Sequence, residues 1–367
     1  MNYYCVILLF LFKQWRCEKT IASYMTNIDV AYMTTLNYGE GKMYRSFDIK
    51  MDIGFSYVNQ RFPEHKGRTH VGDMKVDVYK YHNISGQIYL EEIGFRISNE
   101  TLKSFYYIQC ESITNENSIS LAHKFIDDRY SIVNQLYNHK LIDNKKFSFY
   151  IDTCFSGQLL FGDIPHNIRN LFQYKISLPV DINDIKWKSS MKSVRYLNNE
   201  YDNKDEMYFD SAISNIMAPF SFLSEYNDKV MKDFIFNNIC NMDTMGDQVR
   251  YKCQCHGLNN FPSLDFVFED NIRLHFDKED LFLNYTDVCY FRIENNFYNK
   301  HQWIFGLPVL KKYIVEFDYT NELVTFYSKF PFSSINGNSI QKLIYIIISI
   351  ILLIEIAYNK LINKKHY

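Results

Sequence analysis

Short runs rich in aromatic and β-branched residues recur along almost the whole chain, and they constrain its fold more than any other feature. Such runs are typical of strands, particularly where apolar and polar residues alternate. We expect strands at 28–36, 46–58, 76–81, 86–97, 147–151, 157–162, 264–268, 272–276, 289–293, 303–306, 313–318 and 323–327. The sequence therefore predicts a mostly β protein made of two halves of similar length.

Only two segments have the apolar spacing of a helix. The first is 130–142, and the second is 221–236, where Tyr226, Val230 and Phe234 recur every fourth residue. We expect Ser221 to be the N-cap of the second helix. Between the halves, residues 181–192 are expected to form a bridge.

The N-terminus predicts entry into the secretory pathway. A short apolar run, CVILLFLF at 5–12, is followed by polar and basic residues. This pattern predicts a signal peptide over residues 1–17. A buried N-terminal strand is the alternative for so short a run.

The C-terminus predicts a membrane anchor. Residues 342–358 are almost entirely apolar, and a transmembrane helix needs about 20 such residues. A polar stalk, 331–341, precedes this span, and a basic tail, 359–367, follows it, which marks the cytoplasmic side. We expect a single-pass type I membrane protein whose body, a monomer, lies in a secretory lumen or outside the cell.

The last four residues resemble a dilysine retrieval signal, which would make the protein cycle between the endoplasmic reticulum and the Golgi. They are Lys364, Lys365, His366 and Tyr367. Such a signal is an address read by a receptor. The alternative is an ordinary basic flank of the membrane span.

Six of the eight cysteines lie in the body of the chain: Cys110, Cys154, Cys240, Cys253, Cys255 and Cys289. An even number in a secretory context predicts disulfides. The run Cys253-Gln254-Cys255-His256 leaves a metal site as an alternative, but zinc sites usually separate paired cysteines by two or more residues. We therefore predict no metal and no cofactor.

Two further observations concern the surface. Glycosylation acceptors at Asn83, Asn99 and Asn284 fit a secretory glycoprotein. The formal net charge of -2 and the pI near 6.6 argue against nucleic acid as a partner, which would require a basic surface.

Two segments place an aspartate in similar surroundings. FDIKMDIGFSYV, at 47–58, is similar to the first active-site segment of pepsin-like aspartic proteases, an apolar strand followed by Asp-Thr-Gly-Ser-Ser. YFDSAISNIMAP, at 208–219, resembles the second such segment. YKYHNISG at 79–86 falls where that family has its flap hairpin, and segments 147–165 and 303–318 resemble the end of its first lobe and its closing strands.

This resemblance, from about residue 28 to 327, implies a bilobal pepsin-like acid protease fold. Two β-barrel-like lobes, 18–182 and 183–330, would enclose a central cleft. The implied function is that of an aspartic endopeptidase acting on peptides or proteins. Asp52 and Asp210 would be its catalytic pair, in which one carboxylate takes a proton from water and the other donates one to the scissile carbonyl.

The resemblance also assigns roles to neighbouring residues. Tyr79, Ser85 and Gly86 would belong to the flap that covers the substrate. Cys255 and Cys289 would form the disulfide of the second lobe. The residues expected around the two aspartates are Gly54, Ser56, Ser211, Ala212 and Ser214.

Several positions depart from the family pattern. Hydroxyl residues are replaced by Ile53, Phe55 and Ile213, and glycines by Ser120 and Ala212. A hydrogen bond to a charged group contributes roughly 1.5–3 kcal/mol, so their loss would loosen the aspartate pair. An alternative is therefore a catalytically impaired pseudoprotease that binds peptides at the membrane. An unrelated β-rich receptor ectodomain is a third interpretation.

Overall fold

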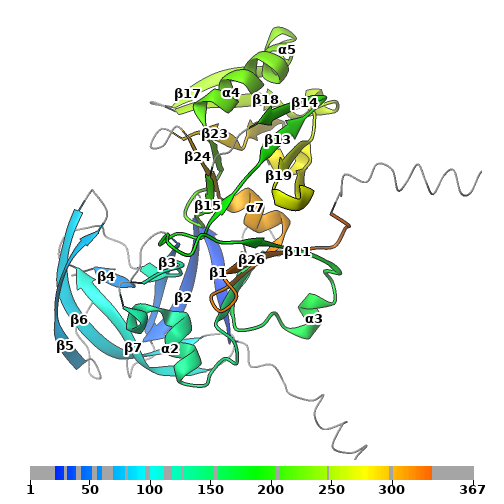
Figure 1. The fold of residues 1–367 in the computed structure, drawn as a ribbon. Helices are drawn as coiled ribbons and strands as arrows, with labels where there is room; N and C mark the ends of the chain where they lie inside the picture. Colours follow the sequence, from blue (N-terminus) through cyan, green and yellow to red (C-terminus); the bar gives the residue numbers. More distant parts are fainter. Residues whose placement is uncertain are drawn as a thin grey trace, which may run out of the picture.

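A computed structural model gives the fold (Figure 1). It describes residues 21–332 except 29–30, 39–42, 52–55, 60–68, 79–81, 96–99, 111–117, 126, 152–155, 203–205, 246–247 and 297–300. Within these residues strands predominate, as predicted. The expected signal peptide and transmembrane helix lie outside the described residues.

The largest sheet combines strands from both ends of the chain. Its order is β11-β26-β25-β9-β10-β1-β2-β3-β8-β4-β7-β6-β5. The strands are β1 (Ile21–Ile28), β2 (Ala31–Tyr38), β3 (Met43–Lys50), β4 (Tyr57–Asn59), β5 (Thr69–Val78), β6 (His82–Phe95), β7 (Thr101–Cys110), β8 (Ser118–Ser120), β9 (Lys146–Ile151), β10 (Ser156–Phe161), β11 (Tyr174–Pro179), β25 (Ile314–Asp318) and β26 (Leu323–Ser328). The last two strands of the chain thus complete a sheet that its first strand also joins.

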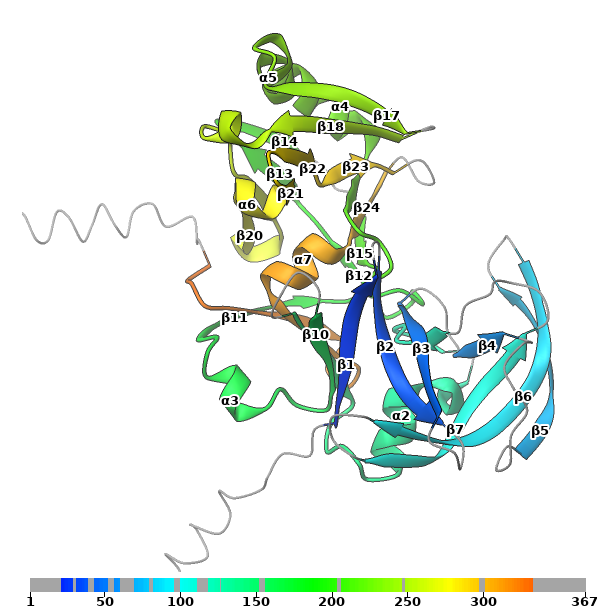
Figure 2. The ribbon, with the colours of Figure 1, turned by 180° about the vertical axis from the view of Figure 1, so that it is seen from behind.

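Three smaller sheets lie between these strands in the sequence. Their orders are β12-β15-β24-β16-β23, β14-β13-β19-β20 and β17-β18-β22-β21. The strands are β12 (Lys188–Ser190), β13 (Ser193–Tyr196), β14 (Asn199–Asp202), β15 (Glu206–Phe209), β16 (Ile216–Ala218), β17 (Cys240–Met245), β18 (Gln248–Gln254), β19 (Leu264–Val267), β20 (Arg273–Phe276), β21 (Phe282–Tyr285), β22 (Val288–Phe291), β23 (Ile293–Asn295) and β24 (Gln302–Phe305). Figures 1 and 2 show β5–β7 and the hairpin β17–β18 at opposite ends of the molecule.

The helices are short: α2 (Ile132–Asn138), α3 (His166–Arg169), α4 (Phe220–Tyr226), α5 (Lys232–Phe236), α6 (Lys278–Leu281) and α7 (Leu307–Lys312). A π-helical turn, η2 (Asn227–Met231), joins α4 to α5, so the predicted second helix exists as one run. The 3₁₀ turns are η1 (Asp128–Tyr130), η3 (Cys255–Leu258) and η4 (Glu269–Asn271).

Some predicted boundaries were wrong. Ser221 is not the N-cap, because the helix begins one residue earlier and Pro219 precedes it. The Ser221 hydroxyl instead lies 2.6 Å from that of Tyr201. The strand expected at 28–36 corresponds to β2, which begins at residue 31 and forms a hairpin with the unpredicted strand β1. The strand expected at 46–58 is divided into β3 and β4.

An aromatic core holds the two halves together near the bridge. Phe147 of β9 and Phe317 of β25 occupy paired positions, with stacked rings 4.6 Å apart. Trp187 is fully buried beside them, and its indole N–H donates to the Leu121 carbonyl at 2.7 Å. Phe209, the residue before Asp210, packs on the Phe317 ring at 5.4 Å. The core therefore fixes the ends of β8 and β15, from which the candidate site extends.

Candidate active site

Two similar strand motifs occur, one in each half of the chain. In the C-terminal motif, β15 runs parallel to β24, β16 runs antiparallel to β24, and β16 runs parallel to β23. In the N-terminal motif, β3, β8, β4 and β7 repeat these three relations in the same order. The repeated topology shows that each half carries one copy of the same construction.

Asp210 lies in the turn that follows β15 of the C-terminal motif. The residue is only 7% exposed, and its Oδ1 accepts the backbone N–H of Ala212 at 2.9 Å. The Asp210 N–H donates to the Phe305 carbonyl at 3.1 Å, which ties the turn to β24. Ala212 therefore still provides the backbone N–H that donates to Asp210, although the family pattern has a glycine at this position.

The turn also reaches across to the N-terminal motif. The buried hydroxyl of Ser211 donates to the carbonyl of Ile49, near the end of β3, at 2.9 Å. Because a backbone carbonyl buried away from water requires a partner, this hydrogen bond holds the two motifs against each other. It brings the segment that follows β3 close to Asp210.

Gly306 explains how the turn can pack so closely. A Cβ at this position would lie 2.2 Å from the carbonyl oxygen of Asn215 and 2.3 Å from that of Ile213. Directly after it, the Leu307 N–H donates to the Ile213 carbonyl at 2.9 Å. Any side chain at position 306 would thus displace the backbone that carries Asp210.

The register of the two motifs gives an unexpected equivalence. Ile304 pairs with both Tyr208 and Met217, and Ser118 pairs with both Asp48 and Tyr57. Tyr208 and Met217 are as far apart in the sequence as Asp48 and Tyr57, so Ser118 is the counterpart of Ile304.

It follows that Ser120 is the counterpart of Gly306, in agreement with its place in the family pattern. The same register makes Lys50, rather than Asp52, the counterpart of Asp210, and it matches Asp52 with Ala212. Asp52 and Gly54 themselves lie outside the described residues.

The remaining predicted residues fall in several places. Ser56 is buried, and its hydroxyl accepts the N–H of Ser120 at 3.0 Å. Ser214 is part of the Asp210 turn. The flap segment is a hairpin of β5 and β6 that closes at the pair Val78 and His82. Ser85, Gly86 and Asn83 lie on β6, whereas Tyr79 and Asn99 lie outside the described residues.

Sequence reasoning missed a group of charged residues behind the Asp210 turn. The Arg292 guanidinium donates to the Ser214 carbonyl at 2.6 Å. The Asn215 amide donates to Oε1 of Glu294 at 2.6 Å, and Arg250 pairs with the same oxygen at 2.6 Å. Burial raises the pKa of the Glu294 carboxyl, whereas Arg250 and Asn215 act in the opposite direction. The only sequence signal was an unusually polar strand, β23.

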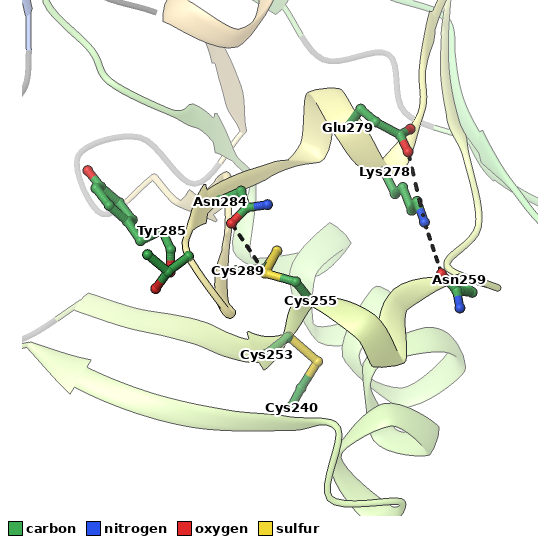
Figure 3. The surroundings of a disulfide bond; sticks show 10 residues. Cys240, Cys253, Cys255, Asn259, Lys278, Glu279, Asn284, Tyr285 and Cys289 are labelled. Carbon is green, nitrogen blue, oxygen red and sulfur yellow. Dashed lines mark hydrogen bonds and ion pairs between the residues drawn. A yellow bond between two sulfur atoms is a disulfide. The ribbon is translucent and has the colours of Figure 1, made fainter.

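Two disulfides lie close together in the C-terminal half, one between strands β17 and β18 and the other between the turn η3 and β22 (Figure 3). Cys255 bonds to Cys289, as the resemblance implied, and Cys240 bonds to Cys253. Both cysteines of the Cys-x-Cys run are therefore engaged in disulfides rather than in a metal site. Asn284 is exposed beside them, with its side-chain oxygen 3.6 Å from the sulfur of Cys255.

These features define a class of protein: a mostly β chain with a duplicated strand motif that presents a buried aspartate in a turn. The profile of the eukaryotic aspartyl protease family matches residues 117–329, more than half of the chain. The chain belongs to this family. No curated protein matches the chain significantly.

Two further findings in the described residues concern membranes and metals. Within the described part of the chain, no helix is both long and apolar enough to cross a bilayer. The expected span at 342–358 lies outside that part. Among the same described residues, no group of three or more His, Cys, Asp or Glu side chains is placed to hold a metal ion.

Proposed function

We propose that the protein is an aspartic endopeptidase that hydrolyses peptide bonds through a water activated by Asp210 and Asp52. The observation that carries this proposal is the hydrogen bond from Ser211 to the Ile49 carbonyl. It brings the Asp210 turn against the end of β3, and Asp52 follows Ile49 by three residues in the sequence.

The chemistry requires two carboxylates that share one proton. The ionised carboxylate accepts a proton from the attacking water, and the protonated one donates to the scissile carbonyl oxygen. The Ala212 N–H, which already donates to Asp210, stabilises the ionised form of that side chain. Tyr79, the residue after β5 in the sequence, would close over the substrate and exclude water. No cofactor takes part.

A second candidate function is peptide binding without turnover. It is favoured by the register that makes Lys50 the counterpart of Asp210, and by Ile53 and Phe55 where the family has hydroxyl residues. A cationic side chain at the first catalytic position could not share a proton with Asp210 in the way a second carboxylate does.

Cleavage of an unfolded protein by the full-length chain in detergent, between pH 3 and 7, tests both candidates. We expect Asp52→Asn and Asp210→Asn each to lower cleavage at least about 100-fold, since each removes one member of the acid–base pair. Lys50→Met is the matched control and should retain cleavage within about threefold.

Other results would change the assignment. Loss of cleavage in Lys50→Met with full cleavage in Asp52→Asn would place the catalytic position at residue 50. A folded wild-type chain that binds a labelled unfolded peptide, but cleaves nothing at any pH, would leave peptide binding as the function.

We further propose that this body faces a secretory lumen or the cell exterior, anchored by residues 342–358. The two disulfides support an oxidising compartment. Protease protection in intact microsomes, with an antibody against residues 359–367, tests the orientation. Only the tail should be digested without detergent.

A further inference from the structure

Charged residues of the segment around β23 hold the Asp210 turn by hydrogen bonds. Two consecutive residues of the turn take part: the Ser214 carbonyl accepts from Arg292, and the Asn215 side chain donates to Glu294. Both partners belong to the segment around β23. The turn is therefore held from β23 on one side and from Gly306 and Leu307 on the other.

Glu294 is itself paired with a residue from a different sheet. Arg250 lies on β18, and its Nε is 2.6 Å from Oε1 of Glu294, the same oxygen that accepts from Asn215. The Glu294 side chain is 4% exposed and that of Arg250 is 29% exposed. A buried carboxylate needs a paired charge to remain ionised, so Arg250 keeps Glu294 able to hold Asn215.

The strand that carries Arg250 is itself fixed. Three residues after Arg250, Cys253 is bonded to Cys240 of β17 and lies directly opposite Cys289 of β22. Cys289 is bonded in turn to Cys255. Side chains that orient a reacting group act best from rigid elements, and here two disulfides hold the strand that supplies the charge.

We propose that Arg250 and Glu294 are positioning residues for Asp210, acting through Asn215 on the turn that carries the catalytic carboxylate. The inference rests on the proposed function, because it gives these residues a role in the placement of a catalytic group. Neither residue touches the reacting atoms. Their effect is on how well the turn is held, and a small displacement of a reacting group can lower a rate by about 100-fold.

The test compares Arg250→Gln with Arg250→Lys and with Arg195→Gln in the full-length chain. Arg195 is the matched control, since it also is 29% exposed and forms an ion pair, with Glu200 at 2.8 Å, but on β13 and β14. We expect Arg250→Gln to lower kcat about 10- to 100-fold with KM changed less than about threefold. Arg250→Lys should recover most of kcat, and Arg195→Gln should stay within about twofold of wild type.

Hydrogen–deuterium exchange supplies a readout that does not depend on activity. In Arg250→Gln, amides of residues 211–216 should exchange about tenfold faster, with the rest of the C-terminal half unchanged. Equal acceleration across that whole half, or no acceleration at 211–216, would overturn the positioning role.

The two hypotheses fail in different ways. If the wild-type chain cleaves nothing, the proposed function fails, and the exchange experiment still decides whether Arg250 holds the turn. If cleavage is normal and Arg250→Gln behaves like Arg195→Gln, only the positioning role fails.

Discussion

The two copies of the strand motif share a topology but differ in what surrounds the turn. In the C-terminal copy, Gly306 lets the turn pack against β24, and Ser211 extends a hydroxyl to the other half. In the N-terminal copy, the matching positions are Ser120 and Met51, and both side chains are buried. The C-terminal copy thus keeps the tight construction, whereas the N-terminal copy has accepted bulkier residues.

The side chains that hold the turn from the neighbouring strand also differ between the two copies. Arg292, directly before β23, and Glu294 on β23 hold the C-terminal turn. The strand that corresponds to β23 in the N-terminal copy is β7, and its paired residues Ile108, Gln109 and Cys110 carry no charge. Among the described residues, the charged network therefore accompanies the C-terminal copy, whose turn carries Asp210.

Substitutions at the two matched positions, Gly306 and Ser120, should show the largest difference between the two copies. Gly306→Ser would place a Cβ against the backbone of Ile213 and Asn215, so we expect a loss of about 3 kcal/mol in unfolding free energy and loss of cleavage. Ser120→Gly should cost less, about 1–2 kcal/mol, because it adds backbone freedom and removes the hydroxyl that accepts from the Ala122 N–H at 3.4 Å, but it causes no clash.

Urea unfolding of both variants measures the difference. Equal costs at the two positions would show that the register equivalence of Ser120 and Gly306 has no energetic meaning.

Ser211→Ala should have the next largest effect. It leaves the buried Ile49 carbonyl without its partner at 2.9 Å, which costs about 1–3 kcal/mol. We expect cleavage to fall as well, since the two motifs lose a direct connection. Ser177→Ala, which breaks a 2.8 Å hydroxyl pair with Thr325 in the large sheet, is the control and should lower stability without lowering cleavage. Cleavage unaffected by Ser211→Ala would mean that this connection does not position the site.

Local sequence patterns predicted the C-terminal strands well but not which strands they pair with. The strands expected at 264–268, 313–318 and 323–327 agree with β19, β25 and β26 to within a residue, because each is a short apolar run bounded by turn residues. The pairing of Cys255 with Cys289, implied by resemblance, was also confirmed. By contrast, no local signal shows that β25 pairs with β9 from the other half.

The candidate site was less predictable for a related reason. Arg250 and Glu294 are distant in sequence and read as surface charges, and only the packing of β18 on β23 brings them into contact. Strand β7 was missed because Thr101–Cys110 mixes polar and aromatic residues without clean alternation. The two-residue difference between Asp52 and the counterpart of Asp210 is a property of strand register, which a motif of five residues does not specify.

Two histidines extend the comparison to pH and have the smallest expected effects. In the N-terminal half His123 is buried, and desolvation lowers its pKa below the ordinary value of 6.5. In the C-terminal half a hydrogen bond to Asp265 raises the pKa of His275 above that value.

The two histidines therefore change the folding stability in opposite directions with pH. The stability that His123 contributes to the fold is complete above pH 6.5 and is lost as pH falls through its lowered pKa. That of His275 is complete below pH 6.5 and is lost as pH rises through its raised pKa.

Urea unfolding of His123→Gln and His275→Gln between pH 5 and 8 checks this difference. Relative to each variant, the wild-type chain should lose stability toward acid for His123 and toward base for His275. The second change should be less than about 1 kcal/mol, because the 40% exposed His275 side chain is screened by solvent. Slopes of the same sign would contradict the assignment of these environments. Opposite slopes would show that His275, in the half that also holds Asp210, adds stability in acid, whereas His123 in the N-terminal half lowers it there.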